Sequence, residues 1–226
     1  MPMRSSPRLA RAAWLLALLL PLPALAQSAA SPEAEWQAYE SAFVDGARHA
    51  DLWQAGWTSV YAGSLAVNAW QASEASDDDD RFDARVGTVK SALALGGMLL
   101  DRQPHPAALR ELREGDDGVA RARALLESVA AEERRRRGFR ARLGSLAVNT
   151  AAGLAIAVGD DRERDGALNF ATGMLVSELQ LLTQPGQAGA AINRFRPVKV
   201  SLGELRLKGE MAWLVSPRRL GVALRY

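Results

Sequence analysis

The stretch GSLAVN occurs twice in this chain of 226 residues, at Gly63–Asn68 and again at Gly144–Asn149, 81 positions apart. The same offset superposes four further residues, Asp79, Asp80, Arg81 and Leu100, on Asp160, Asp161, Arg162 and Leu181. One such match can arise by chance, but several matches at a single offset indicate an internal duplication. We therefore predict a fold that is built from two copies of one unit.

Each copy contains two apolar segments joined by a charged turn, which predicts a helical hairpin. In the first copy, residues 52–73 carry no charge, residues 74–85 form an acidic turn, and residues 86–100 return with Lys90 as their only charge. In the second copy the corresponding segments are 143–159, 160–165 and 166–183, and Glu178 is the only charge of the returning segment. Prolines follow both returning segments, where helices commonly stop: Pro104, Pro106 and Pro185.

Amphipathic segments precede both hairpins. Between the hairpins, four apolar residues fall on one helical face: Val119, Ala122, Leu126 and Val129. Two pairs with a spacing of four, Glu132 with Arg136 and Glu133 with Arg137, are expected to support this helix from its charged face. Before and into the first hairpin, aromatic residues recur three or four positions apart, which is typical of core packing: Trp36, Tyr39, Phe43, Trp53, Trp57 and Tyr61.

The predicted fold class is mainly α. We expect a helical bundle over residues 27–190, made of two duplicated units, each an amphipathic helix followed by a helical hairpin. Repeat one covers about 32–103 and repeat two about 116–184. After residue 190 the apolar period changes to two, as in Val198, Val200 and Leu202. This period predicts a small C-terminal antiparallel β meander within residues 191–226, with turns near Lys208–Glu210 and Ser216–Arg219.

The first 26 residues have the layout of a secretory signal peptide. Arg4, Arg8 and Arg11 precede an apolar run, and a small-x-small triplet ends at Ala26. We predict cleavage after Ala26 and export to the bacterial cell envelope, either to the periplasm or in association with a membrane. A membrane anchor is the alternative, but the apolar run is short and is followed by two prolines at residues 21 and 23.

Charge divides the mature chain into two unequal parts. Without the leader there are 25 basic and 26 acidic residues, but residues 27–133 carry a net charge of −10 and residues 134–226 a net charge of +9. We expect the two parts to face each other and to neutralise much of this asymmetry. The chain has no cysteine, which excludes disulfides, thiolate chemistry and cysteine metal sites.

The common catalytic motifs are missing from the sequence. VGTVKS, which contains Lys90, lacks the glycine-rich lead of a phosphate-binding loop, and His49 and His105 are the only imidazoles. Asp77–Asp80 with Asp83 could hold a hard cation, but the ligand spacing of a calcium loop is absent. We favour a solvated turn that caps the returning helix, and we assign no catalytic, cofactor-binding or metal residue and expect no cofactor.

Four polar residues interrupt the apolar segments and are the candidate internal pairs: Asn68, Asn149, Lys90 and Glu178. Because a buried amide or charge is costly without a partner, we expect Asn68 to meet Asn149 and Lys90 to pair with Glu178. The densest basic patch is a separate candidate, for contact with anionic lipid headgroups: Arg134, Arg135, Arg136, Arg137, Arg140 and Arg142. A solvated helix end tied to Glu132 and Glu133 is the equally weighted alternative for this patch.

These features favour a non-catalytic exported envelope protein, structural or adaptor-like, that associates with a membrane or a membrane protein through its apolar hairpins. We expect no nucleic-acid partner and leave a small-molecule ligand open. One alternative is an integral four-span membrane protein, transport-like or a scaffold, with an internal Lys90–Glu178 pair. Its loop 102–142, with 11 basic residues, would then lie outside, against the positive-inside preference. A less favoured alternative is an enzyme that uses carboxylates such as Asp77–Asp80 and Asp83.

Overall fold

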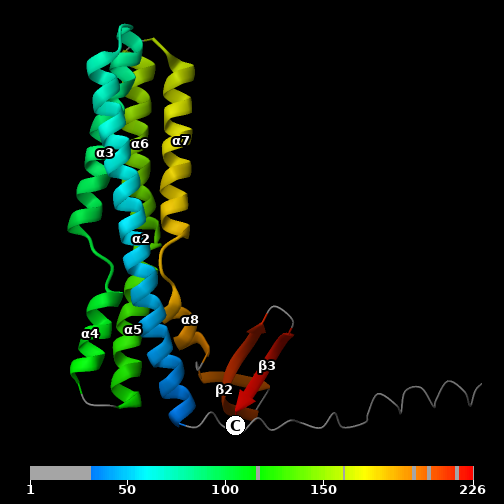
Figure 1. The fold of residues 1–226 in the computed structure, drawn as a ribbon. Coiled ribbons are helices and arrows are strands. Elements are labelled where there is room, and N and C mark those ends of the chain that lie inside the picture. The colour runs from blue at the N-terminus through cyan, green and yellow to red at the C-terminus, as the bar shows by residue number, and fades with distance from the viewer. Residues whose placement is uncertain are drawn as a thin grey trace, which may run out of the picture.

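The protein is mainly helical (Figure 1). A computed structural model describes residues 32–115, 118–159, 161–194, 197–202, 205–216 and 219–225, so the predicted leader lies outside the described residues. The helices are α2 (Pro32–Glu74), α3 (Asp78–Leu100), α4 (His105–Glu114), α5 (Val119–Arg136), α6 (Phe139–Gly159), α7 (Glu163–Leu182) and α8 (Gln187–Arg194). With 43 residues, α2 is about 65 Å long and runs along both parts of the helical structure.

The helices form two bundles that share α2 (Figure 1). Residues 52–74 of α2 run beside α3, α6 and α7, and we call these four segments the hairpin bundle. Residues 32–51 of α2 pack with α4, α5 and α8, and we call these segments the base bundle. The two predicted hairpins are therefore present as α2–α3 and α6–α7.

Each hairpin is preceded by a helix that leads into it almost without a break. The predicted separate helix around Trp36 is instead the first part of the continuous α2. In the second half, only Arg137 and Gly138 separate α5 from α6. Each returning helix is followed by a Gln-Pro pair and a short helix, Gln103-Pro104 before α4 and Gln184-Pro185 before α8, again 81 positions apart.

The base bundle has a conventional apolar core. Tyr39 and Phe43 from α2 pack against Leu112 of α4 and against Leu126 and Val129 of α5. The predicted apolar face of α5 is confirmed, since Ala122, Leu126 and Val129 are all buried. The later part of the aromatic stripe lies in the hairpin bundle, where Trp53, Tyr61 and Met98 form a second, smaller cluster.

Polar side chains hold the turn end of the hairpin bundle. Oδ1 of Asp77 accepts hydrogen bonds from the backbone N–H groups of Asp79 (2.9 Å) and Asp80 (3.2 Å) and caps α3, as predicted. The equivalent cap is absent from α7, whose N-cap residue Arg162 makes no side-chain cap bond. Arg162 instead reaches across to Asp83 of the first hairpin, with an Nη2–Oδ1 distance of 2.5 Å. The two turns are thus joined by an ion pair.

After α8 the backbone follows three extended segments, β1 (Pro197–Leu202), β2 (Leu205–Ser216) and β3 (Arg219–Arg225). The turn predicted at Lys208–Glu210 is wrong, because these residues lie inside the extended segment β2.

Candidate functional site

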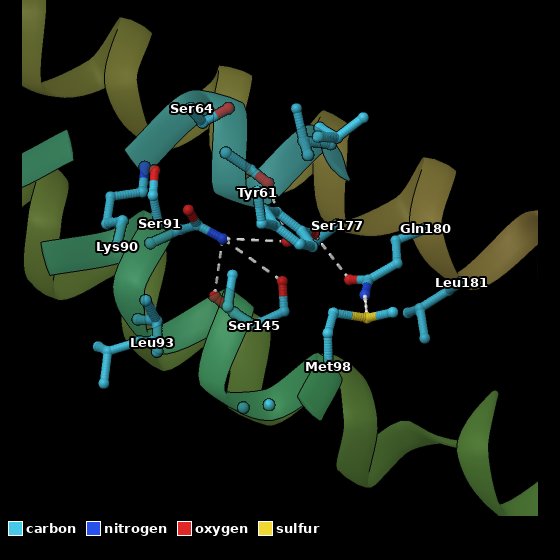
Figure 2. Close-up of a pocket in the computed structure, with 18 of the residues that line it drawn as sticks. Tyr61, Ser64, Lys90, Ser91, Leu93, Met98, Ser145, Ser177, Gln180 and Leu181 are labelled. Carbon is cyan, nitrogen blue, oxygen red and sulfur yellow. Dashed lines mark hydrogen bonds between the residues drawn. The ribbon is translucent and has the colours of Figure 1, made fainter. Parts of the chain in front are cut away.

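A cavity of about 1050 Å³ lies between the two hairpins (Figure 2). Its wall carries hydroxyl and amide side chains from all four helices, including Ser64, Asn68, Ser91, Ser145, Asn149 and Asn169. Each helix of the hairpin bundle therefore contributes polar groups to the interior. Ligand cavities in proteins commonly have volumes of about 300–1,000 Å³, so this cavity lies at the upper end of that range.

Lys90 is the charged group in the middle of this cavity. Its Nζ donates a hydrogen bond to Oδ1 of Asn169 at 2.7 Å. In the described part of the chain, no carboxylate lies within ion-pair distance of Lys90. The amide of Asn169 is thus the partner that the structure gives to this ammonium group.

The predicted pair of Lys90 with Glu178 is wrong. Glu178 accepts hydrogen bonds from Nε (2.9 Å) and Nη2 (3.1 Å) of Arg142 on α6, at the end of the bundle near the base. Glu178 lies nine residues beyond Asn169 on α7, which is about 13 Å along the helix axis. Lys90 faces α7 at the level of Asn169, so the two charges are at different heights.

Asn68 and Asn149 have matching surroundings but do not pair with each other. Nδ2 of Asn68 donates to the carbonyl of Ser64 at 2.7 Å, and Nδ2 of Asn149 donates to the carbonyl of Ser145 at 2.9 Å. Each amide also lies against a glycine of its own hairpin, Gly87 for Asn68 and Gly173 for Asn149, where a Cβ would overlap it.

The expected contact of Asn68 with Asn149 is therefore wrong, because each amide is held inside its own hairpin. Both GSLAVN stretches are helical and repeat the same local hydrogen bond. Gly173 also lies against Nζ of Lys90. The missing side chain at Gly173 thus gives room to two of the four predicted polar residues at once.

Aromatic side chains of α2 form hydrogen bonds to α7 on the base side of Lys90. The hydroxyl of Tyr61 donates to Oε1 of Gln180 at 2.9 Å, and Nε2 of Gln180 contacts Sδ of Met98 at 3.0 Å (Figure 2). One turn nearer the base, Nε1 of Trp57 donates to Oγ1 of Thr183 at 3.0 Å. These bonds join the first hairpin to the second in the half of the hairpin bundle that is nearer the base.

The junction with the base bundle contains a buried pair that the sequence patterns did not reveal. Nε2 of His105 donates to Oε1 of Glu133 at 2.9 Å, and both side chains are buried. The same carboxylate accepts the backbone N–H groups of Ala188 (3.1 Å) and Gly189 (2.8 Å) in α8. The predicted Glu133–Arg137 pair is therefore wrong, because Glu133 faces the core.

The arginine cluster is largely tied to partners within the protein. Arg135 and Arg136 both bond Glu132, and Arg136 also reaches Asp101 with an Nη2–Oδ1 distance of 2.5 Å. The hydrogen bond from Arg135 holds the pKa of Glu132 below its usual value. Arg137 donates to the carbonyl of Gln184, and Arg142 binds Glu178.

The two remaining arginines of the cluster, Arg134 and Arg140, have exposed side chains. No ion pair of either one is found among the described residues. The alternative of a helix end tied to residues of the protein therefore fits four members of the cluster. Among the described residues of the cluster, only Arg134 and Arg140 present free guanidinium groups to an external anion.

The outer surface of the hairpin bundle is strongly apolar. Of the 19 large apolar side chains that are exposed on the described helices α2–α8, 18 lie on this bundle and one, Val44, lies on the base bundle. Four of the 18 also line the cavity, Val60, Leu93, Val148 and Leu168, and the other 14 do not. Exposure reaches 74% for Val158, 73% for Phe139 and 89% for Leu100. This part of the protein therefore has polar groups inside and apolar groups outside.

Among the described residues, length and apolar composition alone single out one helical segment that is long enough to cross a membrane, Val119–Gly159. Among the described residues, no group of three or more His, Asp or Glu side chains is arranged to hold a metal ion. The acidic turn has structural partners instead: Asp77 caps α3, Asp78 binds Arg81, and Asp83 binds Arg162.

Compared with known protein families, curated proteins and solved structures, the chain has no significant match. Its function is therefore inferred from the geometry of the cavity and of the apolar outer surface.

Proposed function

We propose that the protein is a non-catalytic envelope protein whose hairpin bundle is inserted in a lipid bilayer while its base bundle lies in water. The observation that carries this proposal is the placement of 18 of 19 exposed large apolar side chains on the hairpin bundle. Soluble proteins rarely expose an apolar surface of this extent, and such surfaces mark membrane or protein contacts. Of the alternatives left open by the sequence, the integral four-helix protein is thus favoured, with a different internal partner for Lys90.

Energetics support a lipid environment for this surface. Moving one large aliphatic side chain out of water is favourable by about 1.5–3 kcal/mol. The 14 exposed apolar side chains that do not line the cavity therefore favour a bilayer by tens of kcal/mol in rough terms. Among the described residues of the base bundle, Val44 is the one exposed large apolar residue, so transfer of this bundle into a bilayer brings no comparable gain in free energy.

The lengths of the uncharged segments fit a bilayer. Residues 52–73 of α2 rise about 33 Å and residues 143–159 of α6 rise about 25 Å, against a hydrocarbon core of about 30 Å. Acidic turns bound the bundle at one end and the arginine cluster bounds it at the other. Lys90 and the cavity amides lower the mean hydropathy of their helices, yet these side chains face the cavity and not the lipid. Composition alone therefore indicates only one spanning segment among the described residues.

The leader determines the orientation that we propose. If residues 1–26 direct export, the base bundle and residues 197–225 lie in the periplasm and the acidic turns point to the cytoplasm. This orientation is opposite to the positive-inside preference, so orientation is part of the test. We further propose that the segment 197–225 is a β meander that stays in water beside the base bundle.

We also propose that the two hairpins descend from a duplicated unit. Three observations support this origin: the shared GSLAVN geometry, the Gln-Pro pairs at the same offset, and the repeated order of long helix, returning helix and short helix. Each unit alone would expose its cavity amides to lipid, whereas two units together enclose them.

Membrane extraction and labelling test the proposal. The chain has no cysteine, so single cysteines at Ser76 in the turn and at Arg110 in the base bundle can be labelled separately with an impermeant maleimide. We expect the protein to stay in membranes after alkaline carbonate, with Arg110→Cys labelled from the periplasm and Ser76→Cys labelled only after lysis. Complete release by carbonate would contradict insertion, and the reverse labelling would contradict the orientation.

A further inference from the structure

Two cations that line the cavity have no ion pair among the described residues: Lys90 in its middle and the exposed Arg140 at its base end. At the turn end, Asp83 and Asp165 both bind Arg162, at 2.5 and 3.3 Å. At the base end, Asp101 binds Arg136 at 2.5 Å. Lys90 lies between these ends and, within the residues that the structure describes, has no carboxylate partner. The centre of the cavity therefore carries one positive charge that the protein does not neutralise.

Hydrogen-bond capacity is also left open around Lys90. An ammonium group has three donors, and the structure uses one of them, for Oδ1 of Asn169. Because Oδ1 of Asn169 accepts from Lys90, the Nδ2 group of the same amide is left as a donor. The hydroxyls of Ser91 and Thr172 line the cavity on the same two helices. A negatively charged oxygen group could thus be met by an ammonium, an amide and two hydroxyl groups.

Apolar side chains line the cavity beside this polar centre. Val60, Leu93, Val148 and Leu168 belong to its wall and are 39–58% exposed. The cavity is therefore open between the hairpins, and its opening is apolar. Figure 2 shows Leu93 on the same helix as Lys90 and Ser91.

From this arrangement we infer that the cavity binds an amphiphile that carries a single anionic oxygen group, with that group on Lys90 and its apolar chain in the opening between the hairpins. The ammonium of Lys90 in the middle of the cavity matches one negative charge, whereas the other unpaired cation of the lining, Arg140, is exposed at the base end. The inference rests on the proposed function in one respect: insertion would place the apolar opening against acyl chains.

The probe for this site is dodecanoate, which combines one carboxylate with an apolar chain. Purified protein is placed in nanodiscs of phosphatidylcholine, and binding of radiolabelled dodecanoate is measured against empty nanodiscs. We expect saturable binding of one molecule for each chain. Dodecanol, which has the same chain and no charge, is expected to compete at least tenfold more weakly, because it offers Lys90 no charged acceptor.

Two substitutions separate the charge of Lys90 from its structural role. Lys90→Met replaces the side chain with an unbranched one that is one heavy atom shorter and has no charge, and it should weaken dodecanoate binding about tenfold or more. Lys90→Arg should bind within a few-fold of the wild type. Arg85→Met is the matched control, since it removes a positive charge from the exposed side of the same helix. Circular dichroism and thermal melting identify any variant that fails to fold.

Two results would overturn the inference: Lys90→Met binding dodecanoate as tightly as the wild type, or no saturable binding by the wild type. If flotation shows that the protein does not enter vesicles, the same titration is run on the released protein in buffer. If the released protein binds dodecanoate in a way that depends on Lys90, this inference holds although the proposed insertion fails. If the protein inserts but shows no such binding, the insertion holds and this inference fails. Nanodiscs with phosphatidylglycerol identify the source: weaker dodecanoate binding in them indicates a lipid headgroup, and unchanged binding indicates a soluble amphiphile.

Discussion

His105 donates the hydrogen on Nε2 to Oε1 of Glu133 at a distance of 2.9 Å, and both side chains are buried where α4, α5 and α8 meet. Glu133 accepts two further hydrogen bonds, from the backbone N–H groups of Ala188 and Gly189. One carboxylate therefore joins the short helices that follow the two hairpins. Nδ1 of the same imidazole has no hydrogen-bond partner within the described residues.

Replacing Glu133 by glutamine should destabilise the base bundle. The single oxygen of the new amide cannot serve all three donors, and the NH₂ group of that amide would face donors at close range, so we expect a loss of about 2–4 kcal/mol in the free energy of unfolding. Glu127→Gln is the control, because Glu127 forms an exposed pair with Arg123 at 3.2 Å and should change stability by less than about 1 kcal/mol. Urea titration followed by circular dichroism measures both. Equal midpoints for the two variants would show that the buried pair does not hold the helices together.

The sequence predicts the hairpins well because their uncharged lengths and charged turns are local features. It also contains a signal for Glu133: this residue follows Val129 by four positions and Leu126 by seven, and so continues the buried face of α5. The four arginines that follow Glu133 favour an exposed ion pair with Arg137 instead. His105 lies on another helix, so the local pattern around Glu133 cannot indicate it as the partner. The partner of Lys90 was not predictable, since it depends on the relative height and rotation of α3 and α7. Burial cost predicts that a partner exists but does not identify it.

The close approach of α6 and α7 depends on Gly166. A Cβ at this position would overlap the carbonyl oxygen of Gly153 and lie 2.9 Å from the backbone nitrogen of Ala157, and backbone atoms cannot move aside as a flexible side chain can. We expect Gly166→Ala to destabilise the detergent-solubilised protein by about 1–3 kcal/mol, seen as a lower Tm. Gly97→Ala is the matched control: no atom lies within 4 Å of its added Cβ, so the gain in helix propensity should leave Tm unchanged or raised. A Tm for Gly166→Ala at or above that of Gly97→Ala would contradict the observed packing.

Glu132 should make stability depend on pH in the acid range. Its pKa in the folded protein is held below the usual value of 4.5, first by the hydrogen bond from Arg135. A carboxyl with a lowered folded pKa contributes stability above its unfolded pKa, and this contribution is lost as the pH falls through the folded pKa. Wild-type protein should therefore lose stability as the pH decreases below about 4.5, and Glu132→Gln should show a smaller loss over the same window.

Glu111→Gln provides the comparison for this pH dependence, since it removes an exposed carboxylate from α4 of the same bundle. Its acid profile should follow that of the wild type. Urea midpoints measured at a series of pH values from neutral to about 3 supply the data. Superimposable profiles for Glu132→Gln and the wild type would exclude a contribution from the Glu132–Arg135 bond.

The apolar exterior of the hairpin bundle makes the sharpest prediction about lipid contact. Leu154 lies on α6, is 56% exposed and does not line the cavity, so a charge at this position would face the hydrocarbon core of the bilayer. Insertion of an aspartate near the centre of a spanning helix is unfavourable by about 2.5–3.5 kcal/mol. We expect Leu154→Asp to reduce sharply the fraction of protein that resists carbonate extraction. Val44→Asp is the matched control, because Val44 is the one large apolar side chain exposed on the base bundle in the described chain and should tolerate a charge in water. Loss of membrane retention in Val44→Asp, or full retention in Leu154→Asp, would show that the boundary between lipid and water does not lie between the two bundles.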